Sequence, residues 1–156
     1  MRDLVVATDE YRRTMAAAAG IGQHEASTLG ELLHRGPLPP SAIARRLGIA
    51  SASVTSLLDR LTAAGYVERQ ANPVDRRSVL VVLTPAGRML IVTMFGLFTD
   101  DIERAVRSAR PQHLREFSEV LARMALALRD RAGDRSGIEG DLGRRSAEPA
   151  PTTDDG

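Results

Sequence analysis

The sequence of 156 residues contains no cysteine, no lysine and few aromatic side chains. The absence of cysteine excludes disulfides, cysteine-based metal sites and thiol redox sensing within the chain. All 21 basic residues are arginine, which suits the geometry of phosphate and guanine. A GC-rich genome explains this bias better, because the bias also runs through segments that are not expected to bind DNA. Composition alone therefore excludes a thiol-based role and identifies no partner.

Long apolar runs and targeting segments are also absent. The longest apolar run, Met89 to Phe98, is too short to span a bilayer. The N-terminal region carries Asp3, Asp9 and Glu10 and lacks the cleavage pattern of a signal peptide. We therefore expect a soluble, cytoplasmic protein with no membrane partner.

No grouping of side chains is typical of an enzyme or a metal site. His24, His34 and His113 are separated in the sequence and have no neighbouring pattern of further ligands, which favours surface histidines over metal ligands. The adjacent Asp100 and Asp101 point about 100° apart on a helix, so a solvated face is a better interpretation than a catalytic pair. The sequence has no Gly-rich phosphate loop and no G-x-S-x-G motif. We predict a protein that is not an enzyme and that uses no cofactor or metal.

The central part of the chain has the pattern of a helix-turn-helix. A short helix is predicted over residues 41–47, with apolar side chains on one face and arginines on the other. Gly48 follows it, where a helix C-terminus favours positive φ. A second helix is predicted to end near Ala64, with Ser51 or Ser53 as its N-terminal cap.

This second helix has two different faces. One is an apolar stripe at positions i, i+3, i+4 and i+7, formed by Val54, Leu57, Leu58 and Leu61. The other carries short hydroxyl side chains and an arginine. A helix that reads the DNA major groove needs such a slim end, with side chains that reach bases or phosphates. An ordinary amphipathic surface helix with a serine-rich start explains this helix alone equally well.

Two β-prone runs, residues 66–70 and 78–83, follow the second helix and predict a hairpin. The turn between them holds two turn formers, an acid and two adjacent arginines, namely Asn72, Pro73, Asp75, Arg76 and Arg77. From residue 38 to residue 84, six arginines stand against three acids. A hairpin with a basic tip, directly after the second helix, favours a DNA-binding wing.

The run Asp75-Arg76-Arg77, followed five residues later by Leu83-Thr84-Pro85-Ala86-Gly87, is similar to the D-x-R…L-T signature of the multiple antibiotic resistance regulator (MarR) family. The stretch LLDRLTAAGYVER resembles that family's junction between recognition helix and wing. The resemblance covers Ile21 to Gly87 closely and the flanking helices by their layout. It implies a dimeric winged-helix transcriptional regulator, mainly α with a small β-hairpin wing.

This layout predicts a single domain over residues 1–131. Residues 21–84 would form the winged helix-turn-helix, and residues 1–19 and 85–131 the N- and C-terminal dimerisation helices. Residues 132–156 are rich in Gly, Asp, Arg, Ser and Pro, and a disordered acidic tail is predicted there.

The resemblance also implies which residues contact double-stranded DNA. Hydroxyl side chains of the second helix are predicted to face base edges or phosphates, with Arg60 beside them. The wing arginines are predicted to reach the minor groove, where arginine is favoured, and Asp75 is expected to brace the hairpin by pairing with Arg77. The predicted DNA-binding set is Ser53, Thr55, Ser56, Arg60, Asp75, Arg76 and Arg77.

A homodimer on a pseudo-palindromic operator is implied as well. The helix predicted from Pro85 is apolar nearly all round in its first half, which favours burial in a subunit interface. The resemblance further implies a repressor that a small aromatic effector releases. An effector pocket is predicted at Tyr11, Met15, Met94 and Phe98, although core and interface packing is the simpler interpretation of each of them. The alternative function is a winged-helix protein-interaction module that binds no DNA.

Overall fold

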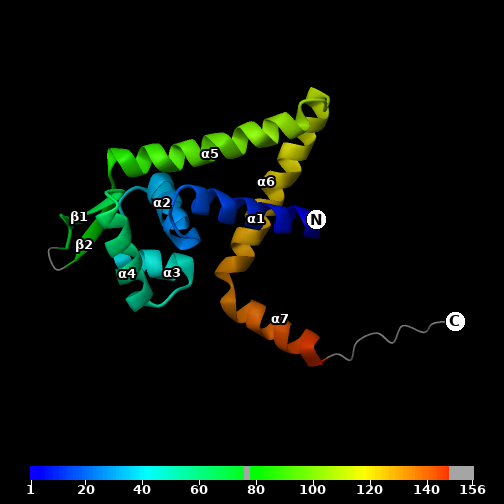
Figure 1. Cartoon of the computed structure of the whole chain (residues 1–156). Helices are drawn as coiled ribbons and strands as arrows, with labels where there is room; N and C mark the ends of the chain where they lie inside the picture. Colours follow the sequence, from blue (N-terminus) through cyan, green and yellow to red (C-terminus); the bar gives the residue numbers. More distant parts are fainter. Residues whose placement is uncertain (76–77, 148–156) are drawn as a thin grey trace. The chain divides into compact units, whose positions relative to one another are not determined.

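The computed structural model describes residues 1–75 and 78–147, which form helices and one antiparallel hairpin (Figure 1). In chain order the elements are α1 (Arg2–Ala18), α2 (Gln23–Arg35), α3 (Pro40–Leu47), α4 (Ser51–Ala63), β1 (Val67–Ala71), β2 (Val79–Leu83), α5 (Pro85–Val106), α6 (Pro111–Gly133) and α7 (Arg135–Ala147). The prediction of a mainly α protein with a small β-hairpin is confirmed. None of the described helices is long and apolar enough to cross a membrane. The chain divides into two compact units, Met1–Ile102 and Glu103–Gly156.

The core of the first unit lies where α2, α3, α4 and the hairpin meet. It includes the whole apolar stripe predicted for α4, whose side chains are all buried. The other buried members are Leu29, Leu32, Ile43, Ala44, Val67, Val81 and Ile91. Because one face of α4 is fully used in this core, its opposite face is the one that remains in solvent.

The turn between α3 and α4 follows the predicted geometry at one end only. Gly48 has φ of 65° after α3, as expected of a left-handed C-terminal residue. The prediction that Ser51 or Ser53 caps α4 is wrong, since Ala50 occupies the cap position and no side chain bonds there. The backbone N–H of Val54 donates to the Ala50 carbonyl at 3.1 Å, so both serines already lie inside the first helical turn.

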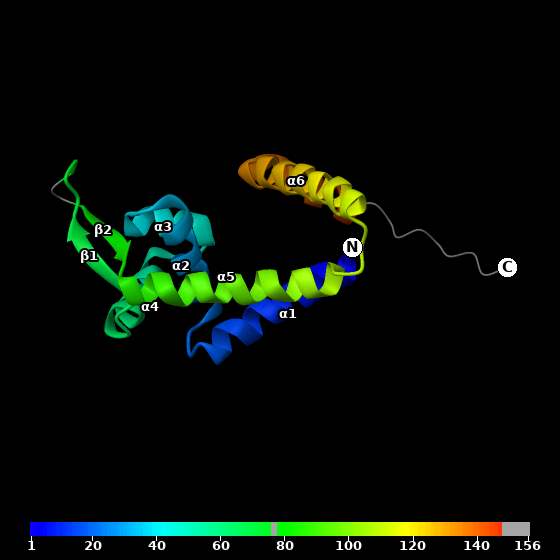
Figure 2. The ribbon, with the colours of Figure 1, turned by 90° about the horizontal axis from the view of Figure 1, so that it is seen from above.

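The hairpin is anchored to the segment that precedes α3. Its strands pair from Val67 opposite Leu83 to Ala71 opposite Val79. Leu38 extends the pairing, since its N–H donates to the Val81 carbonyl at 3.2 Å and its carbonyl accepts the N–H of Val81 at 2.8 Å. Figures 1 and 2 show the hairpin projecting beyond α4, which is the place of a wing.

A close-packed junction joins the hairpin to α5. The hydroxyl of Thr84 donates to the Gly65 carbonyl at 2.6 Å and accepts the N–H of Gly87 at 3.0 Å, so it caps the first turn of α5. The N–H of Thr84 donates to the Tyr66 carbonyl at 3.1 Å. Gly87 is buried, and a Cβ there would lie 2.0 Å from the Tyr66 carbonyl oxygen. The run from Leu83 to Gly87 therefore forms this junction: Thr84 supplies its hydrogen bonds, and Gly87 allows the close approach of the Tyr66 carbonyl.

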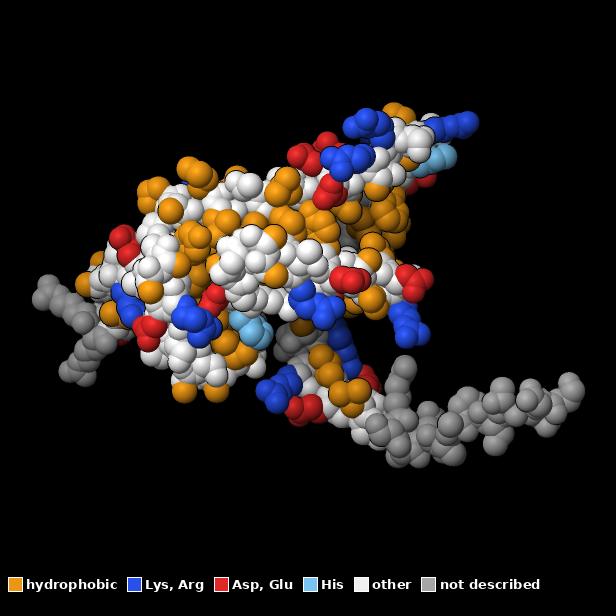
Figure 3. All heavy atoms as spheres, viewed as in Figure 1, with side chains coloured by type: hydrophobic (Ala, Val, Ile, Leu, Met, Phe, Trp, Pro, Cys, Tyr) orange, Lys and Arg blue, Asp and Glu red, His pale blue; other side chains and the backbone are white. Residues whose placement is uncertain are grey.

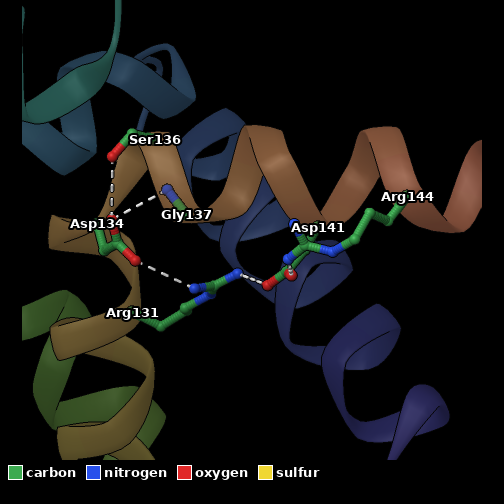
Figure 4. A network of polar contacts seen from close by, with 6 residues as sticks. All are labelled: Arg131, Asp134, Ser136, Gly137, Asp141 and Arg144. Carbon is green, nitrogen blue, oxygen red and sulfur yellow. Dashed lines mark hydrogen bonds and ion pairs between the residues drawn. The ribbon is translucent and has the colours of Figure 1, made fainter.

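The second unit contains a polar corner between α6 and α7, where the sequence predicted disorder (Figure 4). The Asp134 carboxylate accepts the N–H of Gly137 at 3.0 Å and so caps α7. Arg131 contacts Asp134 at 3.2 Å and also pairs with Asp141, which in turn pairs with Arg144. The structure thus differs from the predicted tail over residues 132–147, because a cap and ion pairs stabilise a helix that composition alone did not indicate. The last part of that tail, residues 148–156, lies outside the described residues.

Candidate nucleic-acid interface

The outer face of α4 presents hydroxyl groups to solvent, as predicted. Ser53, Thr55 and Ser56 are all exposed. The hydroxyl of Thr55 donates to the Ser51 carbonyl at 3.3 Å and that of Ser56 to the Ala52 carbonyl at 3.5 Å. Both groups keep acceptor capacity directed away from the core. The face is therefore small, polar and accessible along the first two turns of α4.

Arg60 lies on the same face but has a partner that the sequence did not reveal. Its Nε donates to Oε1 of Glu25 at 2.5 Å, while 64% of the arginine side chain stays exposed. The spacing from Gly22 to Glu25 could have indicated a helix cap. No local pattern links Glu25 to a residue 35 positions later.

A second ion pair ties α4 to the wing. Arg69 on β1 donates to the carboxylate of Asp59 at 2.8 Å, and both side chains are substantially exposed. An exposed pair of this kind contributes at most about 1 kcal/mol to stability. The pair therefore marks a contact between the polar face of α4 and the hairpin and does not by itself fix their relative orientation.

The wing loop is organised by Asn72 and Ser78. The side chain of Asn72 accepts the N–H of Val74 at 3.0 Å and donates to the Ser78 hydroxyl at 2.8 Å. The carbonyl of Asp75 accepts both the N–H and the hydroxyl of Ser78, each at 3.0 Å. Asp75 thus supports the loop through its backbone. The predicted contacts of Arg76 and Arg77, including the pairing with Asp75, lie outside the described residues.

A cavity of about 480 Å³ lies in the first unit among α1, α2, α5 and the end of α3. All four residues of the predicted effector pocket, Tyr11, Met15, Met94 and Phe98, line it. The Tyr11 hydroxyl donates to the Asp101 carboxylate at 2.8 Å, and its ring meets Phe98 edge-on with centroids 5.5 Å apart. Several polar groups also line the wall, among them Arg12, Ser27, Glu31, His34 and Arg46.

Apolar side chains remain exposed on α5 in the single chain. Figure 3 shows hydrophobic groups along this helix, and the exposed ones include Met89, Val92, Phe95 and Leu97. Gly87 and Ile91 are its only buried residues among those described. The burial on several sides that the sequence predicts is therefore not provided by the chain itself.

Within the described residues, no group of three or more His, Cys, Asp or Glu side chains could hold a metal ion.

Comparison with known proteins indicates one family of transcriptional regulators. Residues 19–78 match the family described as the MarR family. The HTH-type transcriptional regulators YcgE and YfiV of Bacillus subtilis are 33% and 31% identical over 60% and 62% of this chain. The chain spans 61% of the length of each of these two relatives. The multiple antibiotic resistance protein MarR of Escherichia coli is 34% identical over 43% of this chain and 46% of its own.

Solved structures share the fold at low sequence identity. A MarR family protein from Bacillus stearothermophilus aligns with a TM-score of 0.75 and 19% identity, over 81% of this chain and 89% of that one. A Staphylococcus aureus MepR variant bound to an oligodeoxyribonucleotide aligns with a TM-score of 0.62 and 20% identity, over 81% and 94% of the two chains. These likenesses confirm the winged helix-turn-helix arrangement.

Proposed function

The chain belongs to the MarR family of winged-helix proteins, and we propose on that premise that it is a sequence-specific DNA-binding transcriptional regulator of the cytoplasm. The observation that carries this proposal is the exposed hydroxyl face of α4, backed by a fully buried apolar stripe. In this proposal Ser53, Thr55 and Ser56 meet base edges or phosphates in the major groove. The wing, which contacts α4 through the Asp59–Arg69 pair, carries Arg76 and Arg77 to the minor groove.

The proposed regulator is a homodimer on a pseudo-palindromic operator. The exposed apolar side chains of α5 support this, because contiguous apolar surface of this kind marks an interaction site. The two recognition helices would then lie about 34 Å apart, one turn of B-DNA. The alternative function, a winged helix that binds another protein and no DNA, predicts only weak association with any duplex.

Selection from random duplexes with the purified full-length protein tests this function. We expect enrichment of a pseudo-palindromic sequence, whose affinity falls linearly with the logarithm of salt concentration as phosphate contacts release counterions. Binding that stays weak and independent of sequence, even at low salt, contradicts the proposal and favours the protein-interaction module.

We expect Asn72→Ala to weaken operator binding about tenfold, equivalent to about 1.4 kcal/mol. The substitution removes the two side-chain bonds that hold Val74 and Ser78, so the loop loses the shape in which it meets DNA. Titration of the selected operator, with thermal unfolding to verify the fold, measures the effect. Gln70→Ala on β1 is the control, since the Gln70 side chain bonds with the neighbouring Glu68 side chain, outside the loop. Equal affinities of the two variants would show that loop order has no part in binding.

We also propose that the cavity binds a small aromatic effector that releases the protein from DNA, as a repressor requires. Its aromatic and thioether wall, formed by Tyr11 and Met15 of α1 and by Met94 and Phe98 of α5, suits such a ligand. An effector present at about 100 times its Kd should stabilise the protein by about 2.7 kcal/mol. A screen of aromatic compounds by thermal unfolding would find it.

Met15→Trp should abolish that thermal response, because the larger side chain fills the space that the ligand needs. Operator binding in the absence of ligand should be unchanged, since Met15 is on α1 and lies outside the proposed DNA-binding set. A ligand that stabilises Met15→Trp as strongly as the unaltered protein does not bind in this cavity.

A further inference from the structure

Glu25, in the first turn of α2, has a buried carboxylate that connects two elements. Only 9% of its side chain is exposed. One oxygen, Oε2, accepts the N–H of Gly22 at 2.8 Å at the start of α2. The other, Oε1, accepts the Nε–H of Arg60 on α4 at 2.5 Å. A buried charge is costly unless it is paired and hydrogen-bonded, and both oxygens of this carboxylate have partners.

Arg60 belongs to the exposed stripe that is proposed to face DNA. Ser53, Ser56 and Arg60 lie at i, i+3 and i+7 on α4, and all three are exposed, so they follow one side of the helix. The contact with Glu25 is made through Nε, whereas a guanidinium presents five N–H donors in a planar fork. Fixing Nε therefore sets the plane of the group and leaves its outer donors in solvent, consistent with the 64% exposure of the side chain.

We infer that Glu25 is a positioning residue for DNA binding: it holds the guanidinium of Arg60 so that the outer N–H groups meet a phosphate beside α4. This inference rests on the proposed function. An unrestrained arginine loses rotamer freedom when it binds, and a pre-oriented one loses less. If Glu25 instead withheld Arg60 from DNA, the guanidinium would be enclosed, and the exposure of the side chain does not agree with that.

The test compares operator affinity over a range of salt concentrations for four proteins: the unaltered chain, Glu25→Gln, Arg60→Ala and the double variant. Glutamine still offers an oxygen to the Gly22 N–H, but it has no charge with which to hold the guanidinium. Arg60→Ala should bind about tenfold more weakly, with the slope of log K against log salt reduced by about 0.9 for the lost phosphate contact. Glu25→Gln should bind three- to tenfold more weakly. The double variant should match Arg60→Ala within twofold, because Glu25 acts only through Arg60.

Glu10→Gln is the matched control, since it removes the same charge from an exposed site on α1. Because α1 belongs to the predicted dimerisation helices, Glu139→Gln on α7 serves as a second control, since the side chain of Glu139 is 62% exposed and lies outside the predicted DNA-binding and dimerisation segments. Glu139→Gln should alter affinity by less than twofold. If Glu25→Gln tightens operator binding, the positioning role is overturned. It is also overturned if the double variant loses as much binding free energy as the two single variants lose together. Absence of any preferred duplex for the unaltered protein overturns the proposed function, and this inference with it.

Arg60→Lys provides the same test without altering α2. Lysine keeps the positive charge but replaces the planar fork by a compact ammonium, which cannot be oriented through an Nε. Operator affinity should fall at least threefold, and Glu25→Gln should cause no further loss in this background. Undiminished affinity of Arg60→Lys would show that only charge matters at this position, which contradicts the inference.

Discussion

Gly87→Ala is expected to destabilise the protein by about 3 kcal/mol or more, at the upper end of the costs of overpacking a core. The added Cβ would lie 2.0 Å from the carbonyl oxygen of Tyr66 and 2.8 Å from its carbonyl carbon. That carbonyl also accepts the N–H of Thr84 at 3.1 Å, so it cannot move without breaking the junction between β2 and α5. For a chain of this size the thermal midpoint should fall by about 6–12 °C.

Gly30→Ala is the matched control. It makes the same change from glycine to alanine, but it is expected to raise the stability of the protein and not to lower it. A Cβ on Gly30, inside α2, would meet the ring of Phe95 at 3.7 Å, an ordinary van der Waals contact. Alanine in place of glycine in a helix interior is favourable by up to about 1 kcal/mol. Thermal or urea unfolding of both variants measures the contrast. Equal midpoints for the two variants would mean that α5 does not pack against Tyr66 as described.

Local sequence patterns predicted the features that depend on neighbours in the chain. Apolar spacing predicted the stripe of α4, all of which is buried. Glycine after an amphipathic segment predicted the left-handed residue at Gly48. The four predicted cavity residues do line one space, although they come from α1 and α5, which three helices and the hairpin separate in the chain. The family resemblance supplied that placement, and periodicity alone would not have done so.

The missed features depend on polar side chains that meet across long separations. Glu25 and Arg60 are 35 positions apart, and a buried glutamate at a helix start has no pattern that distinguishes it from an exposed one. Asn72 was recognised as a turn former, but its bond to Ser78 required the register of the two strands. Composition suggested disorder after residue 131, where a capping aspartate and ion pairs stabilise a further helix.

Phe117→Glu is expected to separate the proposed dimer and so to reduce operator binding to the weak affinity of a single half-site. None of the residues of α6 is buried in the single chain. Its apolar stripe, at Leu114, Phe117, Leu121, Met124 and Leu128, continues for most of its length, and Phe117 is 51% exposed. If the partner subunit covers this stripe, a glutamate there is buried without a partner, at a cost of several kcal/mol. A cost of about 2.7 kcal/mol weakens the dimer roughly 100-fold.

Light scattering at micromolar concentration measures this effect, together with titration of the selected operator. Gln112→Glu is the control, because it adds the same charge about 140° around α6 from Phe117. The control should remain dimeric and bind the operator normally, whereas Phe117→Glu should be a folded monomer with only the weak affinity of a single half-site. A Phe117→Glu protein that stays dimeric would show that the apolar stripe of α6 is not covered by a second copy. The homodimer would then have to form through other exposed apolar side chains of the described residues, such as those of α5 or those at the start of α1.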